Sequence, residues 1–377
     1  MAASGGRGVT AAGSPDPAGD ALSRRGNNPG ALAEAGTARG GSRVRTARHC
    51  AVVLAVLLAS LVVAGPDALA GARAAGSLHL IIEPRAGMGG IDRLLSTAHH
   101  SVDLEMYELD DPVVESILAA DAARGVRVRV ILDKAYIGYK NAAAFAYLGA
   151  RHVAVRWAPA RFDLDHEKAA VIDDTTALVM TMNFTARYYA TTRDVVVVDI
   201  QPTDVAAIET TFDGDWGTGG AAPAPTGKDL LWSPGSERAL VDLIDSARVS
   251  VYVENEEMGD PYITDALAGA ARRHVKVIVV MTEDSSWRGA LDSLAAAGVE
   301  VRTYPDTESA LYIHAKLVVV DPRRTDGRVF VGSENFSVAS LLYNRELGIV
   351  TARPAFVEVL ARLVASDAAG GTAWHQR

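Results

Sequence analysis

Two short stretches of the chain carry the same combination of a histidine, a lysine and an aspartate. The two sets are His166, Lys168 and Asp173, and His314, Lys316 and Asp321. Both stretches fit the pattern H-x-K-x4-D, and their histidines lie 148 residues apart. An imidazole can attack phosphorus or carry a proton, and an ammonium group can hold the negative oxygens of a phosphate. Two such sets in one chain predict a shared polar site for chemistry on a phosphodiester.

An asparagine and then an acid follow each set. They are Asn183 and Asp194 after the first set, and Asn335 and Glu346 after the second. A side-chain amide can donate hydrogen bonds to the same phosphate oxygens that the lysines hold. A carboxylate that accepts an imidazole N–H fixes the reactive tautomer of the ring. We therefore expect the asparagines to bind phosphate together with the two lysines, and the acids to orient the two histidines.

The expected reaction needs the two sets to face each other. The phosphorus is attacked from one side while the leaving oxygen is protonated from the other. One histidine acts as nucleophile and forms a phosphohistidine, and the other protonates the leaving alcohol and then activates water. His166 and Lys168 are two residues apart, so on a strand they project from the same face. Asp173 and its counterpart Asp321 fall on the opposite parity or at the strand end, where they support the backbone or nearby polar groups.

This doubled pattern resembles the phospholipase D superfamily, whose signature is the paired HKD motif, and in particular a secreted bacterial phospholipase D-like protein. The resemblance covers roughly residues 78–350. It implies that the six motif residues form the catalytic set, that His166 is the nucleophile and His314 the acid, and that no metal or cofactor takes part. The first copy departs from the family pattern, with Thr181-Met182-Asn183 in place of Gly-Ser-x-Asn and Asp194 in place of a glutamate.

The elements that carry the two sets repeat along the chain. Hydrophobic patterning predicts strands at 78–83, 101–107, 126–132 and 152–157, with helices at 89–100, from Asp111-Pro112 onward and at 141–148. The second half repeats this order, with Asp260-Pro261 in the place of Asp111-Pro112. A repeated β-α-β-α-β-α-β order predicts an α/β fold of two similar lobes, each with a mixed, mainly parallel sheet flanked by helices. The active site is then expected at the lobe interface. The expected boundaries are 76–212 for the first lobe, 213–227 for a Gly/Pro linker and 228–377 for the second lobe.

The N-terminal part of the chain reads as a targeting segment and not as part of the lobes. Residues 1–48 are rich in Gly, Ala, Ser and Arg without hydrophobic periodicity, which predicts a disordered basic leader. Residues 49–70 combine a short apolar run with Ala68-Leu69-Ala70, the pattern of a cleaved signal peptide. The expected location is therefore outside the cell, with an uncleaved N-terminal membrane anchor as the alternative.

The net charge of the chain limits the kinds of partner that it is expected to bind. The formal net charge is -9, and residues 1–70 hold seven arginines against four acids, so the remainder is more acidic still. An acidic body makes nucleic acid an unlikely partner, because phosphate backbones are bound by basic surfaces. The only cysteine is Cys50, so stability must come from the core and not from disulfides. Two motif sets in one chain further predict a monomer with a pseudo-twofold site.

Two further features near the motifs leave alternatives open. Glu105 and Glu254 occupy matching places on repeated strands, where each either lines the cleft or lies on the surface. A set of aromatic residues near the motifs either forms an apolar mouth for acyl chains or belongs to the core. These are Trp157, Phe162, Tyr188, Tyr189, Trp287, Tyr304, Tyr312 and Tyr343.

The function expected from these observations is that of a phospholipase D-type phosphodiesterase. It hydrolyses the headgroup ester of a phospholipid to phosphatidic acid, makes transient contact with the membrane surface, and transfers the phosphatidyl group to another alcohol when one replaces water. A secreted nuclease or other phosphodiesterase, and a cardiolipin-synthase-like transferase with a retained anchor, would use the same residues. A catalytically inactive surface binding module is the alternative of another class, and it predicts no loss of function when either histidine is replaced.

Overall fold

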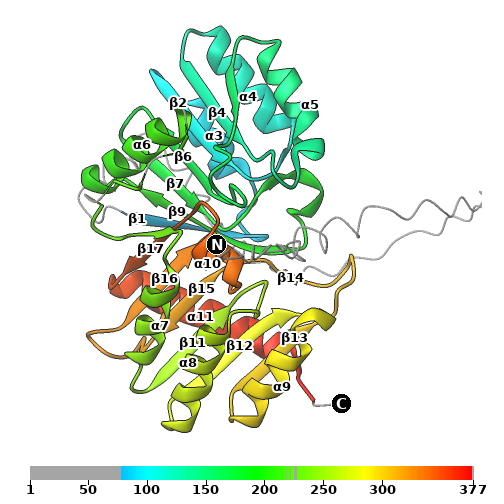
Figure 1. Ribbon diagram of the computed structural model, residues 1–377, viewed down its shortest axis with the longest axis vertical. Coiled ribbons are helices and arrows are strands. Elements are labelled where there is room, and N and C mark those ends of the chain that lie inside the picture. Colours follow the sequence, from blue (N-terminus) through cyan, green and yellow to red (C-terminus); the bar gives the residue numbers. More distant parts are fainter. Residues whose placement is uncertain (1–77, 218, 221, 225–226, 376–377) are drawn as a thin grey trace, which may run out of the picture.

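The computed structural model describes residues 78–217, 219–220, 222–224 and 227–375. The expected leader and signal segment, residues 1–48 and 49–70, lie outside the described residues. The described chain forms two lobes stacked one above the other in Figure 1, which we call the first lobe (residues 78–216) and the second lobe (residues 228–375).

The first lobe is built on one long sheet. Its strands are β1 (Leu78–Glu83), β2 (Ser101–Met106), β4 (Arg127–Leu132), β5 (Ala154–Trp157), β6 (Lys168–Ile172), β7 (Thr176–Met180) and β9 (Thr192–Asp199), and a small separate pair joins β3 (Leu109–Asp110) to β8 (Phe184–Thr185). Its helices are α3 (Gly89–Ser96), α4 (Pro112–Ala123), α5 (Gly138–Gly149) and α6 (Pro202–Trp216). The spatial order of the strands is β1-β9-β7-β6-β2-β4-β5.

The second lobe repeats this plan. Its strands are β10 (Leu230–Ser233), β11 (Ser250–Glu254), β12 (Lys276–Thr282), β13 (Glu300–Tyr304), β14 (Tyr312–Ile313), β15 (Leu317–Val320), β16 (Arg328–Gly332), β17 (Glu346–Thr351) and β18 (Thr372–Ala373). Its helices are α7 (Glu237–Asp245), α8 (Pro261–Arg272), α9 (Arg288–Ala296), α10 (Val338–Leu342) and α11 (Pro354–Gly370). The sheet order is β10-β17-β16-β15-β11-β12-β13-β18, so the expected pair of similar α/β lobes with mixed sheets is confirmed.

Parallel pairing occupies only one half of each sheet. In the first lobe β2, β4 and β5 pair in parallel, whereas β6, β7, β9 and β1 join antiparallel, and the second lobe does the same. The expectation of mainly parallel sheets therefore holds only for the halves built from β-α-β units. The motif strand β6 and its neighbours β7 and β9 are connected without crossover helices, and short connections make antiparallel neighbours.

The helix starts expected from the sequence are present. Asp111 accepts hydrogen bonds from the backbone amides of Val113 and Val114, and Asp260 accepts one from that of Ile263. Each aspartate therefore satisfies amides that have no partner inside the helix, while a proline takes the first helical position. One boundary expected from the sequence was wrong. Because α6 continues to Trp216, the Gly/Pro segment begins at residue 217 and not at Asp213.

Three hydrophobic cores hold the layers together. One core lies in the first lobe between its sheet and helices α3, α4 and α5, and a second lies in the other lobe between its sheet and α7, α8 and α9. The third contains residues of both lobes, including Val171 and Val179 from the first and Leu317 and Val331 from the second, together with residues of α6 and α11. The two lobes therefore share one buried core, which fixes their relative position and with it the site between them.

Candidate active site

Each motif histidine is paired with an acid from the opposite lobe. His166 Nδ1 in the first lobe lies 2.8 Å from Glu346 Oε2 in the second. His314 Nδ1 in the second lobe lies 2.8 Å from Asp194 Oδ1 in the first. All four side chains are buried. Neither lobe alone can therefore assemble a histidine with its orienting acid.

Backbone pairing across the interface brings these partners together. Asp165, just before His166, forms an isolated parallel bridge with Arg345, and the amide of His166 donates to the carbonyl of Arg345 at 3.0 Å. The second lobe mirrors this, since β14 runs parallel to the start of β9 and the amide of His314 donates to the carbonyl of Arg193 at 3.2 Å. In each case the orienting acid is the next residue after the paired arginine.

Those two arginines also connect the two lobes through buried ion pairs. Arg345 Nε lies 2.7 Å from Asp215 Oδ2 near the end of α6, and neither side chain is exposed to solvent. Arg193 Nε lies 2.6 Å from Asp367 Oδ2 near the end of α11. Each Arg-acid dipeptide therefore serves two contacts with the other lobe: the acid contacts the histidine and the arginine contacts the final helix.

The two motif lysines are fully buried beside the histidines. Lys168 Nζ donates to the carbonyl of His166 at 2.7 Å, and Lys316 Nζ lies 3.0 Å from Glu256 Oε2. Burial lowers the pKa of Lys168 to about 7, and the charge of Lys316 acts in the same direction while that of Glu346 opposes it. Burial likewise raises the pKa of Glu346 to about 7. The site therefore titrates close to neutral pH.

The two asparagines differ in their contacts. Asn183 is buried beside His314, where it lines a pocket together with Thr185, Tyr188, Tyr189 and Thr192. Asn335 is also buried, but its Nδ2 donates to Glu257 Oε1 at 3.0 Å. In this structure Asn183 is thus placed to meet a ligand at His314, whereas Asn335 is held by a neighbouring acid.

The motif aspartates accept hydrogen bonds from backbone amides and lie away from the histidines. The carboxylate of Asp173 accepts from the amides of His99, His100 and Ser101 at 2.6 to 3.0 Å. Asp321 accepts in the same way from the amides of Arg248, Val249 and Ser250. These contacts match the supporting role expected from their position on the strand. In this structure Asp173 and Asp321 anchor the start of β2 and β11 beside the motif strands, and their place in the catalytic set stays a prediction.

A glutamate that the motif analysis missed lies on the second histidine and lysine. Glu256 Oε2 is 3.3 Å from His314 Nε2 and 3.0 Å from Lys316 Nζ, and Glu256 Oε1 accepts from the hydroxyl of Tyr312 at 2.8 Å. Burial acts to raise the pKa of Glu256, but the charges of His314 and Lys316 outweigh it and lower the pKa to about 2. Glu256 follows β11 two residues after Glu254, and a run of three acids around Asn255 was the signal available in the sequence.

The first lobe has an aromatic ring at the matching position. Tyr107 follows Glu105 as Glu256 follows Glu254. The ring of Tyr107 meets that of His166 edge-on with centroids 4.6 Å apart, and Lys168 Nζ lies 4.9 Å from the centre of the same ring. The two halves of the site are therefore related by pseudo-symmetry in their motifs but differ in the group that covers them.

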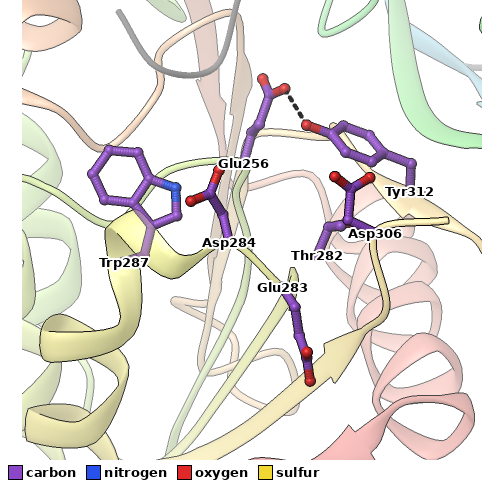
Figure 2. A pocket seen from close by; sticks show the side chains of 7 residues that line it. All are labelled: Glu256, Thr282, Glu283, Asp284, Trp287, Asp306 and Tyr312. Atoms are coloured by element: carbon purple, nitrogen blue, oxygen red, sulfur yellow. Dashed lines mark hydrogen bonds between the residues drawn. The ribbon is translucent and has the colours of Figure 1, made fainter. Parts of the chain in front are cut away.

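An acidic pocket opens next to Glu256, on the side of β12. Figure 2 shows Glu256 hydrogen-bonded to Tyr312, with Asp284, Asp306 and Trp287 around the same space and the carboxylate of Glu283 directed away from it. The other pocket at His314, between β8 and β9, is lined largely by tyrosine and threonine side chains. His314 thus lines the pocket with the tyrosines, and its neighbour Glu256 lines the carboxylate-lined pocket.

Several acids close to the motifs are buried. Glu105 and Glu254 are 2% and 0% exposed, so the interpretation that placed them on the surface is wrong. Burial raises the pKa of both well above the usual value, and it does the same for Glu167, inside the first motif, and for Glu334. Burial therefore favours the neutral form of these carboxyls.

Comparison with known proteins identifies the family. The family model described as "Cardiolipin synthase, PLD-like domain" matches residues 91–216 and 240–367, one segment in each lobe. The chain belongs to the phospholipase D superfamily. The membership expected from the paired motif is thus confirmed, and the two matched segments coincide with the structural repeat.

Individual relatives of this phospholipase D-like chain differ widely in their names. A mitochondrial cardiolipin hydrolase from Xenopus tropicalis is 29% identical over 123 residues, which cover 33% of this chain and 58% of that protein. The matched part thus spans little more than half of that relative. Two solved structures share the fold with a TM-score of 0.61. One is a phosphatidylserine synthase from Haemophilus influenzae (13% identity, 79% of this chain and 87% of that one), and the other is a polyphosphate kinase from Porphyromonas gingivalis (16% identity, 80% and 52%).

In the part of the chain that the structure describes, no helix combines the length and the apolar character needed to cross a bilayer.

Proposed function

We propose that this protein is a phospholipase D-type phosphodiesterase that hydrolyses the headgroup ester of phospholipids to phosphatidic acid. The observation that carries the proposal is the pair of histidine–carboxylate contacts, each assembled from both lobes, beside two buried lysines. This set supplies a nucleophile, an acid and fixed positive charge for the phosphoryl oxygens. Neither a metal nor a cofactor is needed for these steps.

The reaction runs in two steps. Nε2 of His166 attacks phosphorus, the P–O bond to the headgroup breaks, and His314 gives its proton to the departing alkoxide. His314, now neutral, takes a proton from water, whose oxygen attacks the phosphohistidine and releases phosphatidic acid and His166. Ammonium groups of Lys168 and Lys316 hold the non-bridging oxygens throughout. An alcohol in place of water gives a new phosphatidyl ester.

Surroundings of the site favour a lipid over a nucleic acid as substrate. Carboxylates line the pocket beside His314, and such a lining repels a polyanion while it tolerates a cationic headgroup. The tyrosine-lined pocket on the other side of His314 suits the apolar part of a lipid. In this proposal the enzyme is a monomer that contacts the membrane only transiently. It is exported through residues 49–70, and N-terminal sequencing of the mature protein tests this last point.

The decisive experiment follows product formation from phosphatidylcholine vesicles in the presence of EDTA, with and without ethanol. We expect phosphatidic acid in water and phosphatidylethanol when ethanol is added, because both arise from one covalent intermediate. Both products should vanish in His166→Ala. If the wild-type protein forms neither product from phosphatidylcholine, phosphatidylethanolamine or cardiolipin but cleaves single-stranded DNA, the lipid assignment is wrong and the nuclease alternative holds.

A transferase is the second candidate, because the matching family model carries the description of cardiolipin synthase. The same assay separates the two when phosphatidylglycerol is supplied as the acceptor alcohol. A transferase forms cardiolipin faster than phosphatidic acid, whereas a hydrolase forms mainly phosphatidic acid.

A further inference from the structure

Glu256 occupies a position that no part of the proposed reaction has yet used. Its carboxylate bridges the two second-lobe groups that face the substrate, His314 Nε2 at 3.3 Å and Lys316 Nζ at 3.0 Å. The hydroxyl of Tyr312 holds the other oxygen at 2.8 Å. With 7% of its surface exposed, Glu256 is fixed against these partners and screened from water.

The two ring nitrogens of His314 each meet a carboxylate. Nδ1 lies 2.8 Å from Asp194 Oδ1, and Nε2 lies 3.3 Å from Glu256 Oε2. The contact with Asp194 is a hydrogen bond and the contact with Glu256 is an ion-pair contact, and two carboxylates this close to one ring favour the positively charged imidazolium over the neutral imidazole. Asp194 Oδ1 in addition accepts from the Thr181 hydroxyl at 2.6 Å, which is a bond that an ionised carboxylate makes well.

The remaining groups around His314 do not favour the neutral ring over the imidazolium. Lys316 is the one cation in the contacts described, and Glu256 lies on its ammonium group as well as on the ring. The other neighbours are uncharged: Tyr312, whose ring centroid lies 6.4 Å from that of His314, and the asparagine, threonines and tyrosines of the shared pocket, which are Asn183, Thr185, Thr192, Tyr188 and Tyr189. In the first lobe the position of Glu256 is taken by Tyr107, whose ring meets that of His166 edge-on.

We propose that Glu256 is a positioning residue that keeps His314 doubly protonated in the resting enzyme, and that this makes His314 the general acid. The inference rests on the proposed reaction and deepens it, because it gives the physical reason why the two histidines take different roles. Glu256 loads the proton on Nε2, the nitrogen that faces the leaving oxygen.

The test measures the protonation of the His314 ring in the free protein, without any substrate. Protein labelled with 15N-histidine is titrated, and the ring signals of His314 are assigned by their loss in His314→Gln. We expect the wild-type ring to stay doubly protonated to a pH at least one unit higher than in Glu256→Gln, a tenfold or larger change in proton affinity. Glu256→Asp, which keeps the charge, should retain most of the effect.

A matched control removes one negative charge from the same pocket without touching His314. Glu283→Gln serves this purpose, since Glu283 lines the pocket and bonds to Thr303. It should leave the His314 titration unchanged. If Glu256→Gln does not fold, Tyr312→Phe removes the hydrogen bond that Tyr312 donates to Glu256 and should shift the titration in the same direction by a smaller amount.

Equal titration midpoints in wild type and Glu256→Gln, or a neutral His314 ring in wild type at pH 6, overturn the inference. The result is independent of turnover, so a protein that shows the shift but does not act on phospholipids would contradict the proposed function alone. With an active enzyme, Glu256→Gln should lower kcat/KM for an alkyl headgroup about tenfold or more above the shifted midpoint. It should have little effect on a p-nitrophenyl ester, whose leaving group needs no proton.

Discussion

Glu346 in the second lobe contacts His166 in the first lobe at 2.8 Å, and Asp194 in the first lobe contacts His314 in the second at the same distance. The site is thus two histidine–acid pairs, each assembled across the lobe interface. Each lobe supplies a histidine and a lysine from its motif and an acid to the histidine of the other lobe. This crossed arrangement makes catalysis depend on correct docking of the lobes.

The first prediction concerns the crossed acids. Glu346→Gln should lower kcat by roughly 10²- to 10⁴-fold, because the amide no longer fixes the His166 tautomer with a negative charge. Asp194→Asn should do the same for His314. Turnover of phosphatidylcholine measures both, and thermal unfolding serves as the check on folding. A folded Glu346→Gln protein with wild-type kcat would contradict this role.

The second prediction separates the two histidines by leaving group. His314→Ala should lose roughly 10²- to 10⁴-fold activity on an ester of an alkyl alcohol but much less on a p-nitrophenyl ester, because p-nitrophenolate leaves without protonation. His166→Ala should lose activity on both substrates, since no covalent intermediate forms. Initial rates of both variants on the two substrates test this prediction. If the p-nitrophenyl ester restored activity to His166→Ala and not to His314→Ala, His314 would be the nucleophile.

The third prediction is a narrow pH optimum. Below pH 7 Glu346, whose pKa burial raises to about 7, gains a proton and can no longer accept from His166 as a carboxylate. Above pH 7 Lys168, whose pKa burial lowers to about 7, loses the charge that holds phosphate. Consequently kcat/KM should peak near pH 7 and fall on both sides, by up to about tenfold per pH unit. Because arginine stays protonated, Lys168→Arg should move the alkaline limb to higher pH. A flat profile from pH 5.5 to 9 would refute this assignment.

The fourth prediction concerns the lock between the lobes. Arg345→Met leaves Asp215 buried without its cation, which should cost about 3–5 kcal/mol of folding free energy. Urea unfolding followed by fluorescence gives the value. Arg238→Met removes an arginine from an exposed pair with Asp242 and should leave the unfolding midpoint unchanged. Equal midpoints for the two variants would show that the buried pair does not hold the lobes.

The fifth prediction separates the motif aspartates from catalysis. Asp173→Ala removes the acceptor of three backbone amides and should lower the free energy of unfolding by about 1–2 kcal/mol, allowing for its partial exposure, with kcat of the folded protein within about twofold of wild type. Although burial acts to raise the pKa of Asp173, the backbone amides lower it. Its contribution is therefore present above the unfolded pKa and lost as pH falls through the lower folded pKa. Acid unfolding of wild type and variant should thus converge at low pH.

Much of the fold followed from local patterns in the sequence. Alternating and continuous apolar runs gave the strands, and Asp111-Pro112 and Asp260-Pro261 gave helix starts whose caps the structure contains. Repetition of these signals implied two similar lobes. Such features depend on residues a few positions apart, and the free energies that fix them are local. The linker was expected to begin at Asp213 because Gly214 and the following glycines are typical of a linker, although α6 continues to Trp216 and arginines hold Asp213 and Asp215.

The sequence by itself indicated which histidines, lysines, asparagines and trailing acids to expect in the site, because a doubled H-x-K-x4-D with a trailing asparagine and acid is typical of one phosphoryl-transfer set. Only the tertiary structure determined which histidine pairs with which acid. Hydrogen bonds between residues 180 and 120 positions apart form only when the shared core docks the lobes. The position of Glu256 on His314 likewise depends on how a strand end from one part of the second lobe meets the motif of another. Short-range patterns carry no information about such contacts, because they arise from packing between segments that are distant in the chain.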